Sequence, residues 1–199
     1  MFDEPHMGQR RRGGWIEIIT GCMFSGKTEE LIRRLNRAII AGQHVEIFKP
    51  AIDKRYHEAD VVSHNERAIR STPVDFANDI ILLAGECDVV GIDEAQFFDE
   101  EIVNVCNKLA NSGKRVIVAG LDMDYEGRPF GMMPQLMAVA EFVTKVHAIC
   151  AKTGELASFS YRLAADESKV MLGSKHHYEA RSRASFMEDM ARKNRDSEK

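Results

Sequence analysis

Apolar residues gather in short runs along the chain, and several of these runs are followed by stretches with helical spacing. The runs are rich in Val and Ile, as expected of strands that are buried on both faces. They predict five strands, at residues 15–20, 44–49, 88–93, 115–121 and 142–149. Strands of this kind are typical of a parallel sheet that is covered on both sides.

The stretches between these runs carry helix signals. Over residues 27–41 apolar positions recur every three or four residues, and Gly42 follows as a stop signal. We expect Asp99 to cap a second helix that Gly113 ends, and Pro134 to open a short third one. The alternation of strands and helices predicts an α/β fold, with a mostly parallel sheet flanked by helices.

The composition is that of an ordinary soluble globular protein, with 44% hydrophobic and 29% charged residues among 199. No apolar run is long enough to span a membrane, and the N-terminal residues show no signal-peptide pattern. The net charge of −4 provides no basic field for nucleic acid. The scattered cysteines favour a reduced compartment. We therefore expect a cytoplasmic protein with no nucleic-acid or membrane partner.

A glycine-rich segment follows the first predicted strand. Gly21, Gly26, Lys27 and Thr28 fit the pattern G-x-x-x-x-G-K-[ST] between a strand and a helix. In such a phosphate-binding loop the backbone N–H groups face phosphate oxygens, the lysine reaches the β- and γ-phosphates, and the threonine hydroxyl ligates Mg²⁺. The four residues between the glycines complete the expected ATP-binding loop: Cys22, Met23, Phe24 and Ser25.

Two carboxylates follow the third predicted strand, in the segment DVVGIDEAQFF. Open α/β sheets bind ligands at the carboxyl ends of their strands, where Asp93 and Glu94 are expected to lie. Asp93 is positioned to hold Mg²⁺ together with Thr28, directly or through water. Glu94 has no evident structural duty and is a candidate general base. Two merely solvated carboxylates are the less favoured interpretation, because the preceding strand is wholly apolar.

Three classes of nucleotide-dependent protein compete at this point. A small-molecule kinase would use Glu94 to accept a hydroxyl proton. A GTP switch would need an N-K-x-D guanine reader, and the segment NKLA at Asn107–Ala110 lacks the aspartate. An ATPase motor or translocase would need a basic channel and usually a longer chain. The residues favour the kinase.

Six segments carry a resemblance to a known family. GCMFSGKTEELIRR, FKPAIDKRY, SHN, IDEAQFF, VIVAGLDMDYEGRPFG and MLGSKHHYEARSRASF follow, in order, the pattern of thymidine kinases of the bacterial and vertebrate-cytosolic type, from about Trp15 to Phe186. The resemblance implies ATP-dependent phosphorylation of the 5′-hydroxyl of thymidine or deoxyuridine. It also implies a RecA-like P-loop core, a homotetramer, and a small zinc-held ribbon domain whose lasso loop closes over the nucleoside.

The resemblance also assigns roles to individual residues. Glu94 matches the catalytic base, and Arg55 matches an arginine that stabilises the transferring phosphoryl group, oriented by Asp53. Gln96 matches the nucleotide-side motif. Further matched positions line the nucleoside pocket or fall in the lasso region: Met23, Phe97, Leu121, Tyr125, Phe130, Arg162, Gly173 and Tyr178. Ordinary core packing remains an alternative for Met23 and Leu121.

Four segments are expected along the chain. Residues 1–14 form an N-terminal arm, and residues 15–147 form the nucleotide-binding domain. Residues 148–187 form the small lasso and ribbon domain, and residues 188–199 form a charged tail.

The small domain departs from the family pattern. Of the four zinc-ligand positions only Cys150 is a cysteine, and Thr153, Ser182 and Ser185 occupy the others. Hydroxyls are poor zinc ligands at neutral pH, so we expect no structural zinc. Hydrogen bonds among the three hydroxyl residues and an apolar plug are expected to close the domain instead. The plug would consist of Ile149, Leu156, Phe159, Leu163 and Phe186.

A rebuilt metal site is the alternative. It would combine Cys150 with His147, His176 or His177. The spacing of these residues fits no common ligand pattern, which disfavours it.

Overall fold

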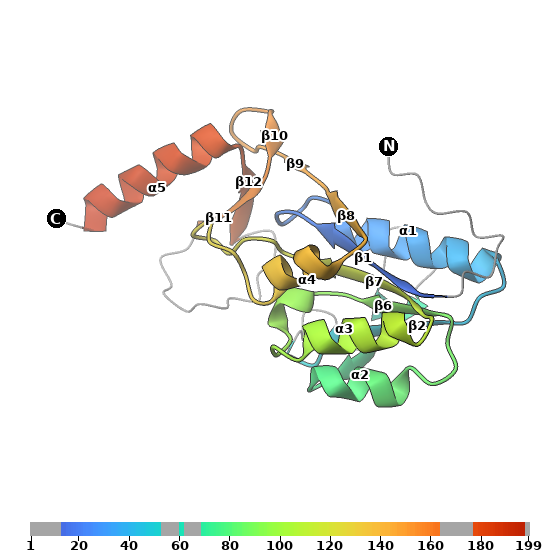
Figure 1. Ribbon diagram of the computed structural model, residues 1–199. Coiled ribbons are helices and arrows are strands. Elements are labelled where there is room, and N and C mark those ends of the chain that lie inside the picture. The colour runs from blue at the N-terminus through green and yellow to red at the C-terminus, as the bar shows by residue number, and fades with distance from the viewer. Residues whose placement is uncertain (1–12, 53–59, 62–68, 164–176, 198–199) are drawn as a thin grey trace.

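A six-stranded parallel sheet forms the centre of the molecule in the computed structural model, which describes residues 13–52, 60–61, 69–163 and 177–197 (Figure 1). Its strands are β1 (Trp15–Thr20), β2 (Val45–Pro50), β5 (Thr72–Val74), β6 (Val89–Ile92), β7 (Arg115–Gly120) and β8 (Phe142–Lys145). They lie in the order β5-β2-β6-β7-β1-β8, and all neighbouring pairs run parallel. The predicted α/β fold with a parallel sheet is confirmed.

Helices cover both faces of this sheet (Figure 1). Leu31 and Leu35 of the first helix pack on one face, whereas Ile80, Ile102 and Leu136 of three later helices belong to the larger core on the other. The helical elements are α1 (Lys27–Ile40), α2 (Ala77–Leu83), the 3-10 helix η1 (Ala95–Phe97), α3 (Ile102–Asn111) and α4 (Met133–Val139). Strands β6 and β7 are buried along their whole length, which explains their nearly unbroken apolar sequences.

One cluster of charges is buried under α1. Glu17 of β1 accepts hydrogen bonds from Arg34 Nη1 at 2.9 Å and from Arg115 Nε at 2.7 Å, and all three side chains are buried. Trp15 Nε1 donates to the same carboxylate at 2.7 Å, and Arg34 also reaches Thr144 of β8 at 3.0 Å. The cluster therefore joins the strand before the glycine loop to the helix after it and to two neighbouring strands.

The stretch expected as one strand over residues 142–149 is divided in two. Val146 N makes a last hydrogen bond to Thr20 O, at 2.8 Å, and the chain then leaves the large sheet. Strand β9 (Ala148–Ile149) pairs antiparallel with β10 (Leu156–Ala157) instead. The prediction of a single strand is wrong because its apolar residues are shared between two sheets.

Asp99 also differs from its expected role. Helix α3 begins at Ile102, and no side-chain hydrogen bond caps it. The Asp99 carboxylate instead accepts from Glu101 N at 3.0 Å and from Ala77 N at 3.1 Å, at the start of α2. Asp99 therefore joins the starts of two helices.

The C-terminal part combines short strands with one helix. Strand β11 (Phe159–Arg162) pairs antiparallel with β12 (Tyr178–Arg181), and α5 (Arg183–Ser197) follows and extends away from the sheet (Figure 1). This helix crosses the boundary that the sequence analysis places after residue 187. A further short pair joins β3 (Asp60–Val61) and β4 (Ile69–Arg70). Within the described ranges, no helix has the length and apolar character needed to cross a membrane.

Candidate active site

The glycine loop connects β1 to α1, as the sequence pattern predicts. Gly21 has a φ of 149°, and a Cβ there would lie 2.2 Å from Val146 O, so only glycine fits. Gly26 has a φ of 85° and forms the N-cap of α1. Lys27 Nζ donates to Cys22 O of its own loop at 2.8 Å. Partial burial lowers the pKa of Lys27, although nearby Glu94 and Asp93 act to raise it.

The end of β6 brings Asp93 to this loop. Thr28 Oγ1 donates to Asp93 Oδ2 at 3.1 Å, so the two residues expected to hold Mg²⁺ are adjacent although β7 separates their strands. Burial and the neighbouring Glu94 carboxylate raise the pKa of Asp93 to about 7. A hydroxyl and a carboxylate are the oxygen ligands that Mg²⁺ prefers, and a cation would offset this crowding of negative charge. The residues present therefore fit a magnesium ion.

Glu94 has an unusual backbone for a residue other than glycine. Its φ of 52° and ψ of 40° lie in the left-handed region, immediately before η1. Such strain is found most often at functional sites. Glu94 N donates to Asp93 Oδ1 at 2.9 Å, and the Glu94 carboxylate accepts from Gln96 Nε2 at 2.6 Å. The carboxylate that the sequence singles out is therefore held firmly beside the magnesium position.

Aromatic residues expected in the nucleoside pocket form two groups. Phe97 and Phe130 meet edge to face, with ring centroids 5.6 Å apart. The Arg162 guanidinium lies 3.7 Å from the centre of the Tyr125 ring and donates to Tyr178 Oη at 2.9 and 3.1 Å. Residues from the loop after β7 and from both strands β11 and β12 are thus brought together.

The small C-terminal part also contacts the glycine loop directly. Met23 N donates to Ser160 Oγ of β11 at 3.0 Å, and Cys22 Sγ donates to Ala157 O at 3.4 Å. Sequence reasoning missed Ser160, because a single serine in a short strand carries no motif. It also missed Asp122, a buried carboxylate paired with Lys145 Nζ at 2.7 Å across the end of β1.

The expected plug of the small domain is partly wrong. Phe159 and Phe186 are buried and stacked, with centroids 4.6 Å apart, as expected. Ile149, Leu156 and Leu163 are 63%, 67% and 48% exposed: the short strands β9 and β10 turn Ile149 and Leu156 to solvent, and Leu163 follows the end of β11. They therefore add little to the plug.

The expected hydrogen bonds among the three hydroxyl residues do not form. Thr153 Oγ1 bonds Glu155 at 3.1 Å, and the buried hydroxyls of Ser182 and Ser185 have no hydrogen-bond partner within the described part of the chain. Burial acts to raise the pKa of Cys150, but hydrogen bonds from the Thr153 hydroxyl and from backbone N–H groups lower it to about 6.

Ion pairs connect helix α5 to the rest of the small domain. Asp189 of α5 accepts from Lys152 Nζ at 2.5 Å and from Arg181 Nε at 3.1 Å, and Arg181 also pairs with Glu179. His147, a candidate for a rebuilt metal site, instead has its Nδ1 3.1 Å from Ser158 Oγ. Among the residues that the structure describes, no group of three His, Cys, Asp or Glu side chains is placed to hold a metal ion.

Four residues singled out from the sequence lie outside the described residues. They are Asp53, Arg55, Gly173 and His176.

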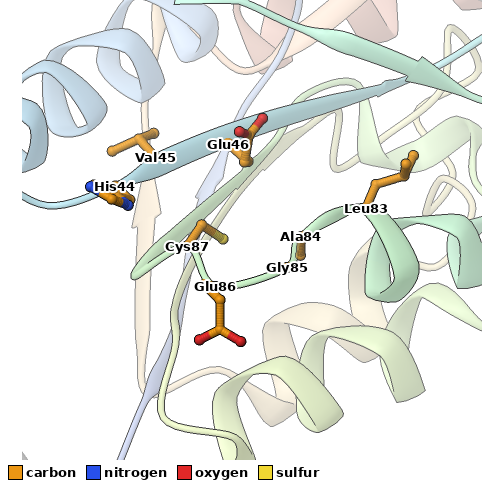
Figure 2. A pocket seen from close by; sticks show the side chains of 8 residues that line it. All are labelled: His44, Val45, Glu46, Leu83, Ala84, Gly85, Glu86 and Cys87. Atoms are coloured by element: carbon orange, nitrogen blue, oxygen red, sulfur yellow. The ribbon is translucent and has the colours of Figure 1, made fainter.

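An open pocket of about 420 Å³ lies elsewhere, at the opposite ends of the strands (Figure 2). His44, Val45 and Glu46 line it from the start of β2, and residues 83–87 line it from the end of α2 and the turn before β6. The glycine loop and Asp93 lie at the carboxyl ends of β1 and β6. This pocket is therefore separate from the candidate active site.

The fold and the site together define a P-loop nucleotide-binding protein. The chain is similar to known proteins over most of its length, and a model of the family "Thymidine kinase" matches residues 14–186. A thymidine kinase of Bacteroides thetaiotaomicron is 58% identical over 187 residues, which cover 94% of each chain. One of a Rhodothermus species is 65% identical over 173 residues, covering 87% of this chain and 81% of the relative. The chain therefore belongs to the thymidine kinase family.

A solved structure also matches at low identity. The flagellar accessory protein FlaH from Methanocaldococcus jannaschii has 15% sequence identity and a TM-score of 0.48, over 72% of this chain and 75% of that one.

Proposed function

We propose that this protein transfers the γ-phosphoryl group of ATP to the 5′-hydroxyl of thymidine, giving dTMP and ADP, with deoxyuridine as a second acceptor. Membership of the thymidine kinase family supports the acceptor. The single observation that best supports the chemistry is the 3.1 Å hydrogen bond between Thr28 and Asp93. It joins the phosphate-binding loop to the acidic end of β6, as phosphoryl transfer requires.

The loop residues bind and orient the triphosphate. Backbone N–H groups of residues 21–26 and the start of α1 face the phosphates, and Lys27 leaves Cys22 O to reach them. Thr28 and Asp93 hold Mg²⁺, which when bound neutralises phosphate charge. Together these residues place the γ-phosphoryl group near Glu94.

Glu94 accepts the proton of the 5′-hydroxyl as the new O–P bond forms. Its fixed carboxylate supports this role, because a general base must lie within hydrogen-bond reach of the proton it removes. Arg55, oriented by Asp53, stabilises the charge on the transferring group, as the family resemblance implies.

The nucleoside lies between the two aromatic groups. Phe97 and Phe130 bound it on one side, together with Leu121 and Met23. Arg162 fixes the two rings it contacts, Tyr125 and Tyr178. Gly173, in the lasso region, completes the site by the resemblance.

Replacing the base tests this assignment. Glu94→Gln keeps the shape of the side chain and should lower kcat by roughly 10²–10⁴-fold, with ATP binding retained. The matched control is Glu100→Gln, which replaces an exposed carboxylate beyond η1 and should leave kcat unchanged. Near-normal turnover by Glu94→Gln would contradict the assignment. Hydrolysis of ATP or GTP without phosphorylation of any deoxynucleoside would favour a switch or a motor instead.

We also propose that the protein folds and works without structural zinc. One thiol with three hydroxyl residues is a poor ligand set, since closed zinc sites use Cys and His. The aromatic stack of Phe159 on Phe186 and the charged cluster around Asp189 support a domain closed by other means. Metal analysis of protein purified without chelators should find no zinc. About one zinc ion per chain, with a lower melting temperature on removal, would overturn this proposal.

The assembly we propose is a cytoplasmic homotetramer. The family resemblance supports the tetramer, and four free cysteines among the described residues suit a reducing compartment. Light scattering at micromolar concentration should give about four chain masses, and a monomer mass would contradict it.

A further inference from the structure

The side chain of Gln96 is held at both ends. It is 3% exposed, its Nε2 donates to Glu94 Oε2 at 2.6 Å, and its Oε1 accepts from Leu121 N at 2.9 Å. A backbone N–H can only donate, so the amide oxygen must face Leu121. The amide NH₂ group must then face Glu94. The orientation of this glutamine is therefore determined by its partners.

Two glycines leave the room that Gln96 occupies. A Cβ at Gly120 would lie 2.9 Å from Gln96 Oε1, and one at Gly131 would lie 2.4 Å from Gln96 O. Gly131 also has a φ of 51°, which favours glycine there. Gly120 thus leaves room for the side chain of Gln96 and Gly131 leaves room for its backbone. In this space the amide has one orientation.

The Glu94 side chain needs such a constraint. Its backbone is fixed by the left-handed conformation and by the bond from Glu94 N to Asp93, but the position of the carboxylate also depends on three side-chain torsions. A donor that is itself immobile removes much of this freedom. Because its oxygen is bound to Leu121, Gln96 also ties the Glu94 carboxylate to the loop that follows β7.

We propose that Gln96 is a positioning residue for the reaction. It fixes the position of the Glu94 carboxylate relative to Leu121 and the loop that follows β7. It does not bind the nucleotide, which is the role that the family motif suggests. Each polar end of its amide has a partner within the protein and the side chain is 3% exposed, which favours this role over contact with ATP. The proposal rests on the assignment of Glu94 as the general base. Misplacing a reacting group by about 1 Å can cost about 10²-fold in rate.

Two variants separate the two ends of the amide. Gln96→Glu keeps the length and an acceptor for Leu121 N, but removes the donor to Glu94. Gln96→Met keeps the length and removes both contacts. We expect kcat to fall about 10- to 100-fold in both, with the KM for ATP within about threefold of the parent value. The KM for thymidine should rise only in Gln96→Met, where Leu121 loses its partner.

Comparison with Glu94→Gln distinguishes the possible failures. If Gln96 acts through Glu94, the double variant Glu94→Gln/Gln96→Met should be little slower than Glu94→Gln alone. A kcat within threefold of the parent in both Gln96 variants would overturn the positioning role while Glu94→Gln remains slow. A raised KM for ATP with unchanged kcat would overturn it in favour of nucleotide binding. Near-normal turnover by Glu94→Gln would instead contradict the base assignment itself.

Discussion

The parallel sheet and the small C-terminal part are stabilised by different interactions. Strands β6 and β7 are apolar and buried on both faces, and helices enclose them in two large cores. The C-terminal strands have one small core of alanines and cysteines, with one stacked aromatic pair beside it. There Asp189, Arg181 and Lys152 supply charged contacts close to the surface.

This difference indicates how each part depends on the other. The sheet and its helices contain most of the buried apolar residues, and burial of such residues is the main stabilising term in folding. The small part shares its core with Cys22 of the glycine loop and bonds Met23 through Ser160. The small part is therefore stabilised partly by its contacts with the glycine loop. Substitutions in the small part should in turn affect that loop.

The largest effect is expected from the buried charge cluster of the sheet. Glu17→Ala removes the carboxylate that binds Arg34 and Arg115, both buried. Breaking a buried ion pair from one side costs about 3–5 kcal/mol, and we expect the lower end of this range because Arg34 retains its ion pair with Glu30. Urea unfolding should show this loss in the free energy of unfolding of the whole protein.

An exposed pair provides the control. Glu126 and Arg128 form an ion pair at 2.7 Å in which the arginine is 74% exposed. Glu126→Ala should change the free energy of unfolding by about 0–1 kcal/mol. Equal decreases in the free energy of unfolding of the two variants would show that the buried cluster stabilises the protein no more than the exposed pair does.

A smaller, local effect is expected from Asp189→Asn in the C-terminal part. Asparagine keeps one acceptor but loses the charge facing Lys152 and Arg181, and Arg181 retains Glu179. A hydrogen bond to a charged group contributes about 1.5–3 kcal/mol, so we expect a loss of about 1–2 kcal/mol. Hydrogen exchange should speed up in β12 and α5 before it does in β6 or β7.

The same residue predicts a pH dependence. Burial acts to raise the pKa of Asp189, but hydrogen bonds from Lys152 and Arg181 outweigh it and leave the pKa below its usual range. The unfolded chain therefore takes up the proton first. The stabilisation is present above the usual pKa of about 3.9 and is lost as pH falls through the folded value. The Asp189→Asn protein should lack this acid-induced loss, and parallel pH profiles for both proteins would contradict it.

The sequence predicts the nucleotide side of the molecule well. Strand β1 matches its predicted range, and α1 and β6 agree to within about a residue at each end. These elements have strong signals, because a buried parallel strand is apolar throughout and the glycine loop has fixed spacing. By contrast, β5 has three residues that include Pro73, and α2 has seven, with Leu82 and Leu83 exposed. Neither shows a clear period.

The contacts of the candidate site could not be predicted in the same way. Gln96 has a place in the motif, but its partner Leu121 is 25 residues away along the chain. Ser160 is 137 residues from Met23. Such contacts depend on how the sheet brings loops together, and a single sequence shows no pattern for them. Ile149 and Leu156 show a different error: their apolar character alone suggests burial, but both are exposed.

The smallest effect is expected at the link between the two parts. Ser160→Ala removes the acceptor of Met23 N and should cost about 0.5–1.5 kcal/mol in free energy of unfolding, the usual worth of one hydrogen bond. For a chain of this size that lowers the melting temperature by about 2–4 °C per kcal/mol. Ser158→Ala is the matched control, because Ser158 bonds His147 on the exposed side and should change stability by less than about 0.5 kcal/mol. Equal melting temperatures for the two variants would show that the bond from Met23 N to Ser160 does not stabilise the protein. A lower melting temperature in Ser160→Ala alone would show that the glycine loop stabilises the small C-terminal part.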